Sequence, residues 1–274
     1  MIIGHINYLN CLPLSYAFEQ QANHPFKIVR DVPAVLNDAI TKGRLDASPV
    51  SSIIYARNFD KLMILPGISI MADDYVQSII LVSKKPIEQI KSGKIILTSQ
   101  SATSHCLLKI IMHNAYNAAP QYVIKNISPE NIFPEPDADA SLFIGDYALY
   151  MKYHKHDDLY YYDIGHEWHK LTGMCMVYAL WVVRRDFAAV NPQETSRMQK
   201  FIQNGFKFGF LQQDKAIDTL ARSKPFTHEQ LDEYLHVIKW DLGTEQLSAL
   251  SLFYKYAYEM KLIDKVPPLD IFKY

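Results

Sequence analysis

Serine and threonine side chains gather at two places where a strand is predicted to end and a helix to begin. One pair opens a predicted helix over 51–56, and the segment 98–104, TSQSATS, comes directly before another helix. The first turn of a helix leaves backbone N–H groups free, and with nearby hydroxyls these can hold a carboxylate or a phosphate. Ordinary helix capping is the alternative at each place, but two such places favour a ligand with two anionic groups. The candidate ligand-binding residues are Ser51, Ser52, Thr103 and Ser104.

Four further candidates stand at the ends of predicted strands. Asn10 follows a strand over 2–8, Gly145 and Asp146 follow a strand over 141–144, and Ser78 begins an apolar strand over 78–82. Asparagine at such a position is commonly a turn or cap residue, whereas glycine lets a ligand approach the backbone closely. Asp146 is a candidate for binding or base chemistry, with a structural cap or hinge contact as the alternative.

The absence or altered spacing of several known motifs argues against some kinds of chemistry. The sequence contains neither GxGxxG nor GxxxxGK[ST], which argues against a dinucleotide or P-loop site, and it contains no GxSxG nucleophile elbow. The segment 166–169, HEWH, places its histidines three apart, while a zinc-binding helix of this type needs a separation of four. His154 and His156 could share one face of a strand, but they lie in a charged segment. We therefore expect no metal and no organic cofactor.

The predicted elements that carry these residues alternate between strand and helix. The series runs from 2 to 83, with two short apolar strands at 63–65 and 68–71, and restarts after 84–86 as if in a new domain. A long apolar strand over 174–183 leads back, and the remaining chain is helical over 192–211, 214–221, 227–235 and 244–260. This pattern predicts an α/β protein of two lobes with a ligand cleft between them. The expected boundaries are 1–83 plus 183–274 for lobe I and 84–182 for lobe II.

Composition narrows the possible environments and partners. The chain has 274 residues, 49% of them hydrophobic, and a formal net charge of -1, so a sizeable core is expected and disorder is not. No basic block is present, which argues against nucleic acid as a partner. The three cysteines are widely spaced, and no apolar run approaches the roughly 20 residues that span a bilayer. Because residues 1–10 do not read as a signal peptide, we expect a cytoplasmic protein without a membrane partner.

Five segments together resemble the chorismate dehydratase family of menaquinone biosynthesis. They are GHINYLNCLPL at 4–14, GRLDASPVSSIIYAR at 43–57, TSQSATS at 98–104, IGDYAL at 144–149, and YDIGHEWHKLTGMCMVYALW at 162–181. The resemblance implies a fold like the type II periplasmic binding proteins, without export. It also implies conversion of chorismate to 3-[(1-carboxyvinyl)oxy]benzoate and water. We expect chorismate as the small-molecule partner and a monomer or homodimer as the assembly.

The same resemblance assigns roles to individual residues. Asn10 matches the active-site asparagine of the family, and the matching cleft-lining positions are Ser51, Ser52, Thr103, Ser104, Gly145 and Asp146. Two positions depart from the family pattern, since Asn7 stands where serine is usual and Cys175 where proline is common.

The identity of the base is open at this point. The amide of Asn10 does not titrate usefully, so we expect it to orient the substrate while a carboxylate accepts the proton. That carboxylate is the substrate's own side-chain group or, alternatively, Asp146. Two other functions are retained: the sister enzyme 1,4-dihydroxy-6-naphthoate synthase, and a non-catalytic cytoplasmic protein that binds an organic anion.

Overall fold

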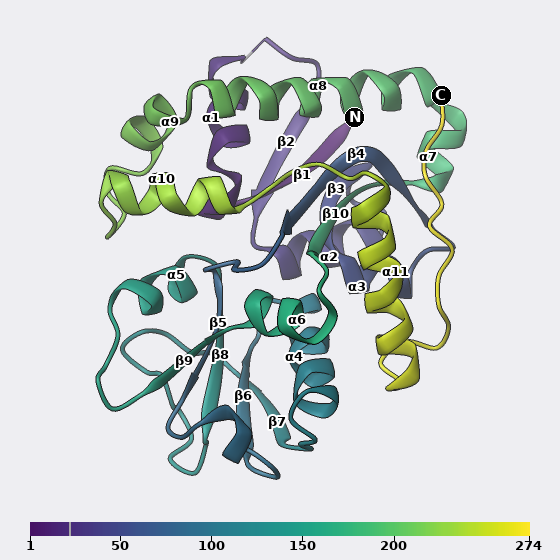
Figure 1. Ribbon diagram of the computed structural model, residues 1–274. Helices are drawn as coiled ribbons and strands as arrows, with labels where there is room; N and C mark the ends of the chain where they lie inside the picture. Colours follow the sequence, from purple (N-terminus) through teal and green to yellow (C-terminus); the bar gives the residue numbers. More distant parts are fainter. Residues whose placement is uncertain (22) are drawn as a thin grey trace.

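Two five-stranded sheets form the framework of the protein (Figure 1). The computed structural model describes residues 1–21 and 23–274. The first sheet has the order β2-β1-β3-β10-β4 and consists of β1 Ile2–Ile6, β2 Lys27–Asp31, β3 Ala47–Ser51, β4 Leu62–Ala72 and β10 Met176–Arg184. The second has the order β7-β6-β8-β5-β9 and consists of β5 Ile79–Ser83, β6 Lys94–Thr98, β7 Gln121–Lys125, β8 Ala140–Ile144 and β9 Tyr160–Asp163.

Helices follow most of the strands, as the alternating pattern predicts. Those after strands of the first sheet, with the C-terminal helices, are α1 Leu12–Gln20, α2 Pro33–Thr41, α3 Ser52–Arg57, α7 Arg185–Val190, α8 Pro192–Leu211, α9 Gln213–Leu220, α10 His228–Val237 and α11 Thr244–Glu259. Those after strands of the second sheet are α4 Thr103–Asn114, α5 Gly145–Tyr153 and α6 Ile164–Thr172. Two short 3-10 helices, η1 Leu9–Cys11 and η2 Ile87–Gln89, complete the set. No helix in the described part of the chain combines the length and apolar character that crossing a bilayer requires.

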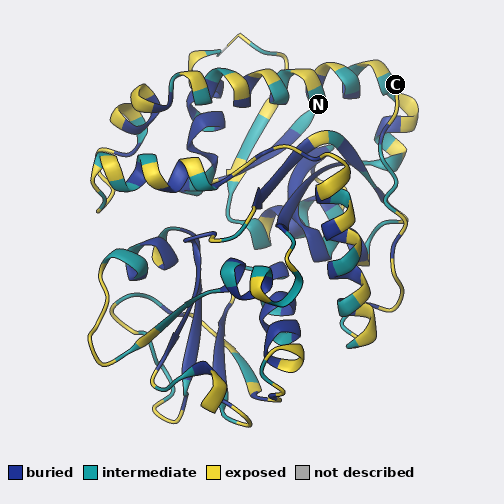
Figure 2. Ribbon diagram, in the orientation of Figure 1, coloured by how far each residue is buried: buried dark blue, intermediate teal, exposed yellow. Residues whose placement is uncertain are grey.

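The central strands of both sheets are apolar along nearly their whole length. Every residue of β5 and β8 is buried, and β10 is buried from Met176 to Val183. Strands covered on both faces are expected to read as continuous apolar runs rather than as an alternating pattern. Figure 2 shows this arrangement, with buried strands inside and the exposed residues mainly on outer helix faces and loops.

The chain crosses twice between the sheets. It leaves the first sheet after β4 and enters the second at β5, which pairs with β8 and β9. It returns through α6 to β10, which pairs antiparallel with both β3 and β4. By sheet membership, 79–83 lies in the second lobe and 176–184 in the first. The predicted domain boundaries themselves stay a prediction.

Two local predictions differ from the structure. The apolar segments 63–65 and 68–71 form one strand, β4, because a register shift opposite Leu180 and Val182 accommodates Pro66 and Gly67 without ending the pairing. His154 and His156 do not lie on a strand; they follow the C-terminus of α5, where the segment is exposed.

Candidate functional site

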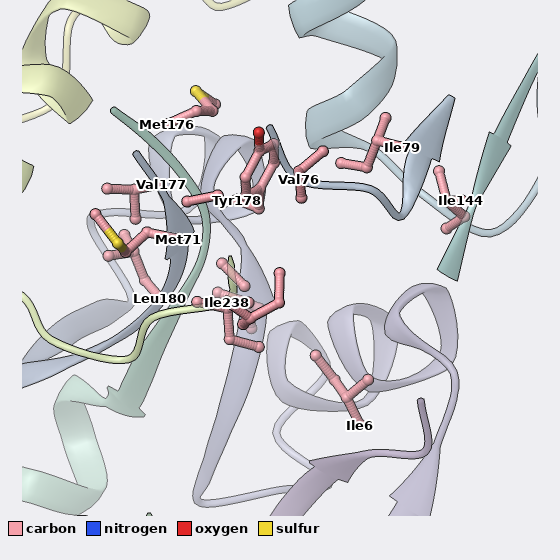
Figure 3. Packing of buried hydrophobic residues seen from close by; sticks show 14 of the residues in the cluster. Ile6, Met71, Val76, Ile79, Ile144, Met176, Val177, Tyr178, Leu180 and Ile238 are labelled. Carbon is pink, nitrogen blue, oxygen red and sulfur yellow. The ribbon is translucent and has the colours of Figure 1, made fainter. Parts of the chain in front are cut away.

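A cavity with an empty volume of about 620 Å³ lies between the two sheets. Its wall is made by Ile6, Tyr8, Asn10, Pro33, Ser51, Ile70, Val76, Ser78, Ile79, Ser101, Thr103, Ser104, Ile144, Gly145, Tyr178, Ala179 and Ile238. Figure 3 shows part of the buried apolar cluster, in which the lining residues Ile6 of β1, Ile144 of β8 and Ile238 after α10 come from widely separated segments.

Six of the eight predicted site residues line this cavity. They are Asn10, Ser51, Ser78, Thr103, Ser104 and Gly145. Asn10, Ser51 and Gly145 come together because β1, β3 and β8 each end at the cavity, with no more than two residues between each strand end and the helix that follows. Ser78 lies just before β5, and Thr103 and Ser104 begin α4. The α/β rule that ligands lie beyond strand ends thus points to the same edge at which this cavity lies.

Ser52 and Asp146 lie outside the cavity wall. The Ser52 hydroxyl donates to the Val177 carbonyl at 2.6 Å, so it joins α3 to β10. The Asp146 carboxylate accepts from the Leu9 N–H at 3.1 Å and forms an ion pair with Lys224 at 2.7 Å. Each is the immediate neighbour of a lining residue, but its side chain is used for contacts between elements.

Three polar atoms in the lining residues are buried without a hydrogen-bond partner. They are Oδ1 of Asn10, in η1, Oγ of Ser104, in the first turn of α4, and the hydroxyl of Tyr178, in β10. Buried polar atoms of proteins nearly always have partners, so an unpaired atom at a cavity calls for an explanation such as a ligand. Asn10 follows a strand of the first sheet and Ser104 follows a strand of the second, and a ligand between them would contact both lobes.

Capping does not account for Ser51. Its side chain makes no capping hydrogen bond to α3; instead its Oγ accepts from Asn37 Nδ2 at 3.2 Å. At the other helix start, the Thr103 Oγ1 accepts from the Ile53 N–H at 3.2 Å, which links the beginnings of α3 and α4 across the two lobes. Ser101 does act as a local cap, since its Oγ accepts from the Ser104 N–H at 3.4 Å.

The described lining residues include no lysine, arginine, histidine, aspartate or glutamate. Two phenols remain as titratable groups. Burial, with the nearby Asp146 carboxylate, raises the pKa of Tyr8, and burial, with Asp163, raises the pKa of Tyr178 well above its ordinary value. Both are therefore neutral at physiological pH, and an anion here would be held by neutral side-chain donors.

Sequence reasoning missed Tyr8, Ser101 and Tyr178 as lining residues. Tyr178 lies beside Ala179, which pairs with Ser51 across β10 and β3, so the sheet carries its ring to the cavity. No local motif reveals this, because the pairing joins segments more than a hundred residues apart. Tyr8 is adjacent to a recognised segment and could have been found from its place at the end of β1.

The histidine-rich segment of α6 lies away from the cavity. His166 Nδ1 lies 2.8 Å from Asp74 Oδ1, and His169 Nδ1 lies 3.0 Å from the Asp73 carbonyl. Within residues 1–21 and 23–274, no three histidine, cysteine, aspartate or glutamate side chains form a group that could hold a metal ion.

Solved structures with the same architecture establish the fold class. A protein of Archaeoglobus fulgidus superposes with a TM-score of 0.77 at 20% identity, covering 96% of this chain and 98% of the other. The alkanesulfonate-binding protein of Xanthomonas axonopodis pv. citri bound to MOPS gives a TM-score of 0.66 at 14% identity, covering 99% and 96%. The predicted two-lobed fold of the type II periplasmic binding proteins is thus confirmed.

Sequence comparison identifies the family. A chorismate dehydratase of Thermus thermophilus is 27% identical over 199 residues, covering 68% of this chain and 70% of the relative. A chorismate dehydratase of Campylobacter jejuni is 26% identical over 265 residues, covering 93% and 96%. The family model described as menaquinone biosynthesis matches residues 1–259. The predicted resemblance is confirmed, and the chain belongs to the menaquinone biosynthesis family.

Proposed function

We propose that the protein is a chorismate dehydratase, which eliminates water from chorismate to give 3-[(1-carboxyvinyl)oxy]benzoate. The observation that carries this proposal is the pair of unpartnered buried atoms, Asn10 Oδ1 and Ser104 Oγ, in the wall of one cavity between the lobes. The two named relatives, both chorismate dehydratases, support the choice of substrate.

The residue types of the wall suit the chemical groups of chorismate. This substrate is a ring with two carboxylates, and the wall combines apolar side chains with hydroxyls and helix starts from both lobes. The side-chain amide of Asn10 and the hydroxyls of the wall are neutral donors, so they can hold carboxylates without lysine or arginine. The apolar residues Ile6, Ile79 and Ile144 provide a surface for the ring.

Hydrogen-bond donors at the ring carboxylate would favour removal of a ring proton from a carbon attached to the double bond that is conjugated with this carboxylate. The hydrogen that leaves is on the carbon bearing the enolpyruvyl ether, and the electron pair of its C–H bond spreads into an extended enolate. Donors at the ring carboxylate stabilise this charge as it develops. The C–O bond to the neighbouring hydroxyl then breaks, the ring becomes aromatic, and the hydroxide and the proton leave as one water.

The residue types in the cavity wall limit which group can act as the base. Since none of the described lining residues carries a carboxylate, imidazole or amine, the protein offers no group of suitable pKa within the cavity. The substrate's own side-chain carboxylate accepts the proton in our proposal, and Asn10 holds the substrate in the conformation that brings this carboxylate to the C–H bond. Asp146 is disfavoured as the base because its carboxylate is held by Leu9 and Lys224 outside the wall.

Incubation with chorismate in buffer containing a chelator tests the proposal, with product followed by mass and by ultraviolet absorbance. We expect the mass to fall by that of one water, and the Asn10→Ala variant to lose this activity. Ser52→Ala serves as the matched control, because Ser52 neighbours the cavity wall without lining it.

The remaining outcomes point to the other candidates. Unchanged chorismate together with a higher melting temperature in its presence would indicate a binding protein. If neither effect occurred, the proposal would be wrong, and the sister reaction that forms 1,4-dihydroxy-6-naphthoate would be assayed with its own substrate.

A further inference from the structure

Asp146 lies between two parts of the chain that belong to the other lobe. It is in the first turn of α5, at the end of β8 in the second sheet. Its Oδ1 accepts from the Leu9 N–H at 3.1 Å, and its Oδ2 lies 2.7 Å from Nζ of Lys224, in the segment between α9 and α10. Both carboxylate oxygens are therefore engaged by groups attached to the first sheet.

The segment that Asp146 holds is the one that carries Asn10. Leu9 is the residue directly before Asn10, and both belong to η1. One residue earlier, the Tyr8 hydroxyl donates to Gln100 Oε1 at 2.6 Å, which gives this segment a second hydrogen bond to the other lobe. The backbone on the N-terminal side of Asn10 is thus tied to the second lobe at two successive residues.

We infer that Asp146 is a positioning residue, whose carboxylate fixes η1 when the lobes are closed and so sets the place of the Asn10 amide at the substrate. This inference rests on the proposed function, in which Asn10 orients chorismate. A charged acceptor makes a stronger hydrogen bond to a backbone N–H than a neutral one does, which suits a contact that must keep a fixed geometry. Lys224 holds the second carboxylate oxygen and orients the first toward Leu9.

A graded set of variants separates positioning from base chemistry. Asp146→Asn removes the ion pair with Lys224 but keeps an oxygen that can accept a hydrogen bond from the Leu9 N–H. Lys224→Met also removes the ion pair and leaves the Asp146 carboxylate in place. Asp146→Ala removes both contacts. We expect kcat to fall about tenfold or more in Asp146→Ala, since small displacements of an orienting group are costly, and less than about fivefold in the other two. A base at Asp146 would instead make Asp146→Asn as inactive as Asp146→Ala.

Lys152→Met is the matched control. Lys152 Nζ forms an ion pair of 2.8 Å with Glu233 of α10, so it also joins α5 to the first lobe, but its hydrogen bonds within the described residues go to Glu233 and Tyr153 and not to η1. We expect its kcat to equal that of the wild type. If Lys152→Met and Asp146→Ala lost the same activity, Asp146 would act only through general lobe closure and the inference would be overturned.

Amide hydrogen exchange at Leu9 tests the contact without any turnover. Exchange should be at least about tenfold faster in Asp146→Ala than in the wild type and unchanged in Lys152→Met. Equal exchange in all variants would overturn the inference even if the enzyme is active. Conversely, a wild type that leaves chorismate unchanged contradicts the proposed function, while Leu9 exchange still reports whether Asp146 holds η1.

Discussion

The aromatic ring of Tyr8 lies directly against the backbone of Gly145. A Cβ atom built on Gly145 would come within 3.1 Å of Tyr8 Cε2, and Gly145 has a φ of 59°. Glycine is thus required here for two reasons, a left-handed backbone and the close approach of a ring from the other lobe. The contact closes one side of the cavity that both residues line.

Replacement of Gly145 by alanine should reduce both stability and activity. The left-handed backbone costs about 1 kcal/mol for alanine, and displacement of the Tyr8 ring adds to it. Gly173→Ala is the matched control, since Gly173 has a φ of 69° but nothing within 4 Å of its Cβ position. Urea unfolding and chorismate turnover should show a larger loss for Gly145→Ala; equal losses in both variants would mean that the Tyr8 contact contributes nothing.

Ser104→Ala and Ser52→Ala should have opposite effects. The Ser104 hydroxyl is buried without a partner, so its removal should leave the free energy of unfolding unchanged or slightly higher while raising KM for chorismate. The Ser52 hydroxyl donates to Val177, and its loss should cost about 1 kcal/mol with little effect on kinetics. Melting temperatures and Michaelis curves on both variants check this; an unchanged KM in Ser104→Ala would remove Ser104 from the binding site.

Asp163→Ala should strongly destabilise the protein, because Asp163 lies where the chain passes between the two sheets. Its carboxylate accepts from the N–H groups of Val76, Gln77, Gly165 and His166, and so joins the segment before β5 to the start of α6. Burial raises the pKa of this carboxyl, and the four N–H groups oppose that rise. We expect a loss of about 2 kcal/mol or more in urea unfolding.

Thr227→Ala provides the comparison for Asp163→Ala. Thr227 caps α10 by accepting from the Gln230 N–H alone, so its loss should cost about 1 kcal/mol. If Asp163→Ala lowered the free energy of unfolding no more than Thr227→Ala, the contacts of Asp163 with Val76 and Gln77 would not contribute to stability.

The stability of the protein should fall on acidification because of His5. Burial, with a smaller effect of Arg30, lowers the pKa of His5 from 6.5 to about 3. Between these values the unfolded chain binds a proton that the folded chain does not, so stability decreases as pH falls, by up to about 1.4 kcal/mol per pH unit. His5→Gln should show a flatter dependence than the wild type in urea unfolding at a series of pH values, and the exposed His154→Gln should not.

Local sequence patterns were sufficient for most elements and for six of the seventeen residues of the cavity wall. The uninterrupted helix α8, which begins at a proline, extends over Pro192–Leu211 as predicted, and six cavity residues lie near strand ends, where the α/β pattern placed them. What the patterns could not give depends on pairing between distant segments. The ring of Tyr178 reaches the cavity only because β10 pairs with β3. Likewise, the engagement of Asp146 with Leu9 and Lys224 depends on how the lobes face each other.

The two crossings between the sheets also bear on the order in which the protein can fold. All five strands of the second sheet lie within residues 79–163, whereas the first sheet needs β10, which pairs with β3 and β4 and ends at Arg184. During synthesis the first sheet therefore stays incomplete until the whole of the second has been made. The N-terminal third of the chain must wait for a strand more than a hundred residues later, which is the kind of long-range pairing that slows folding.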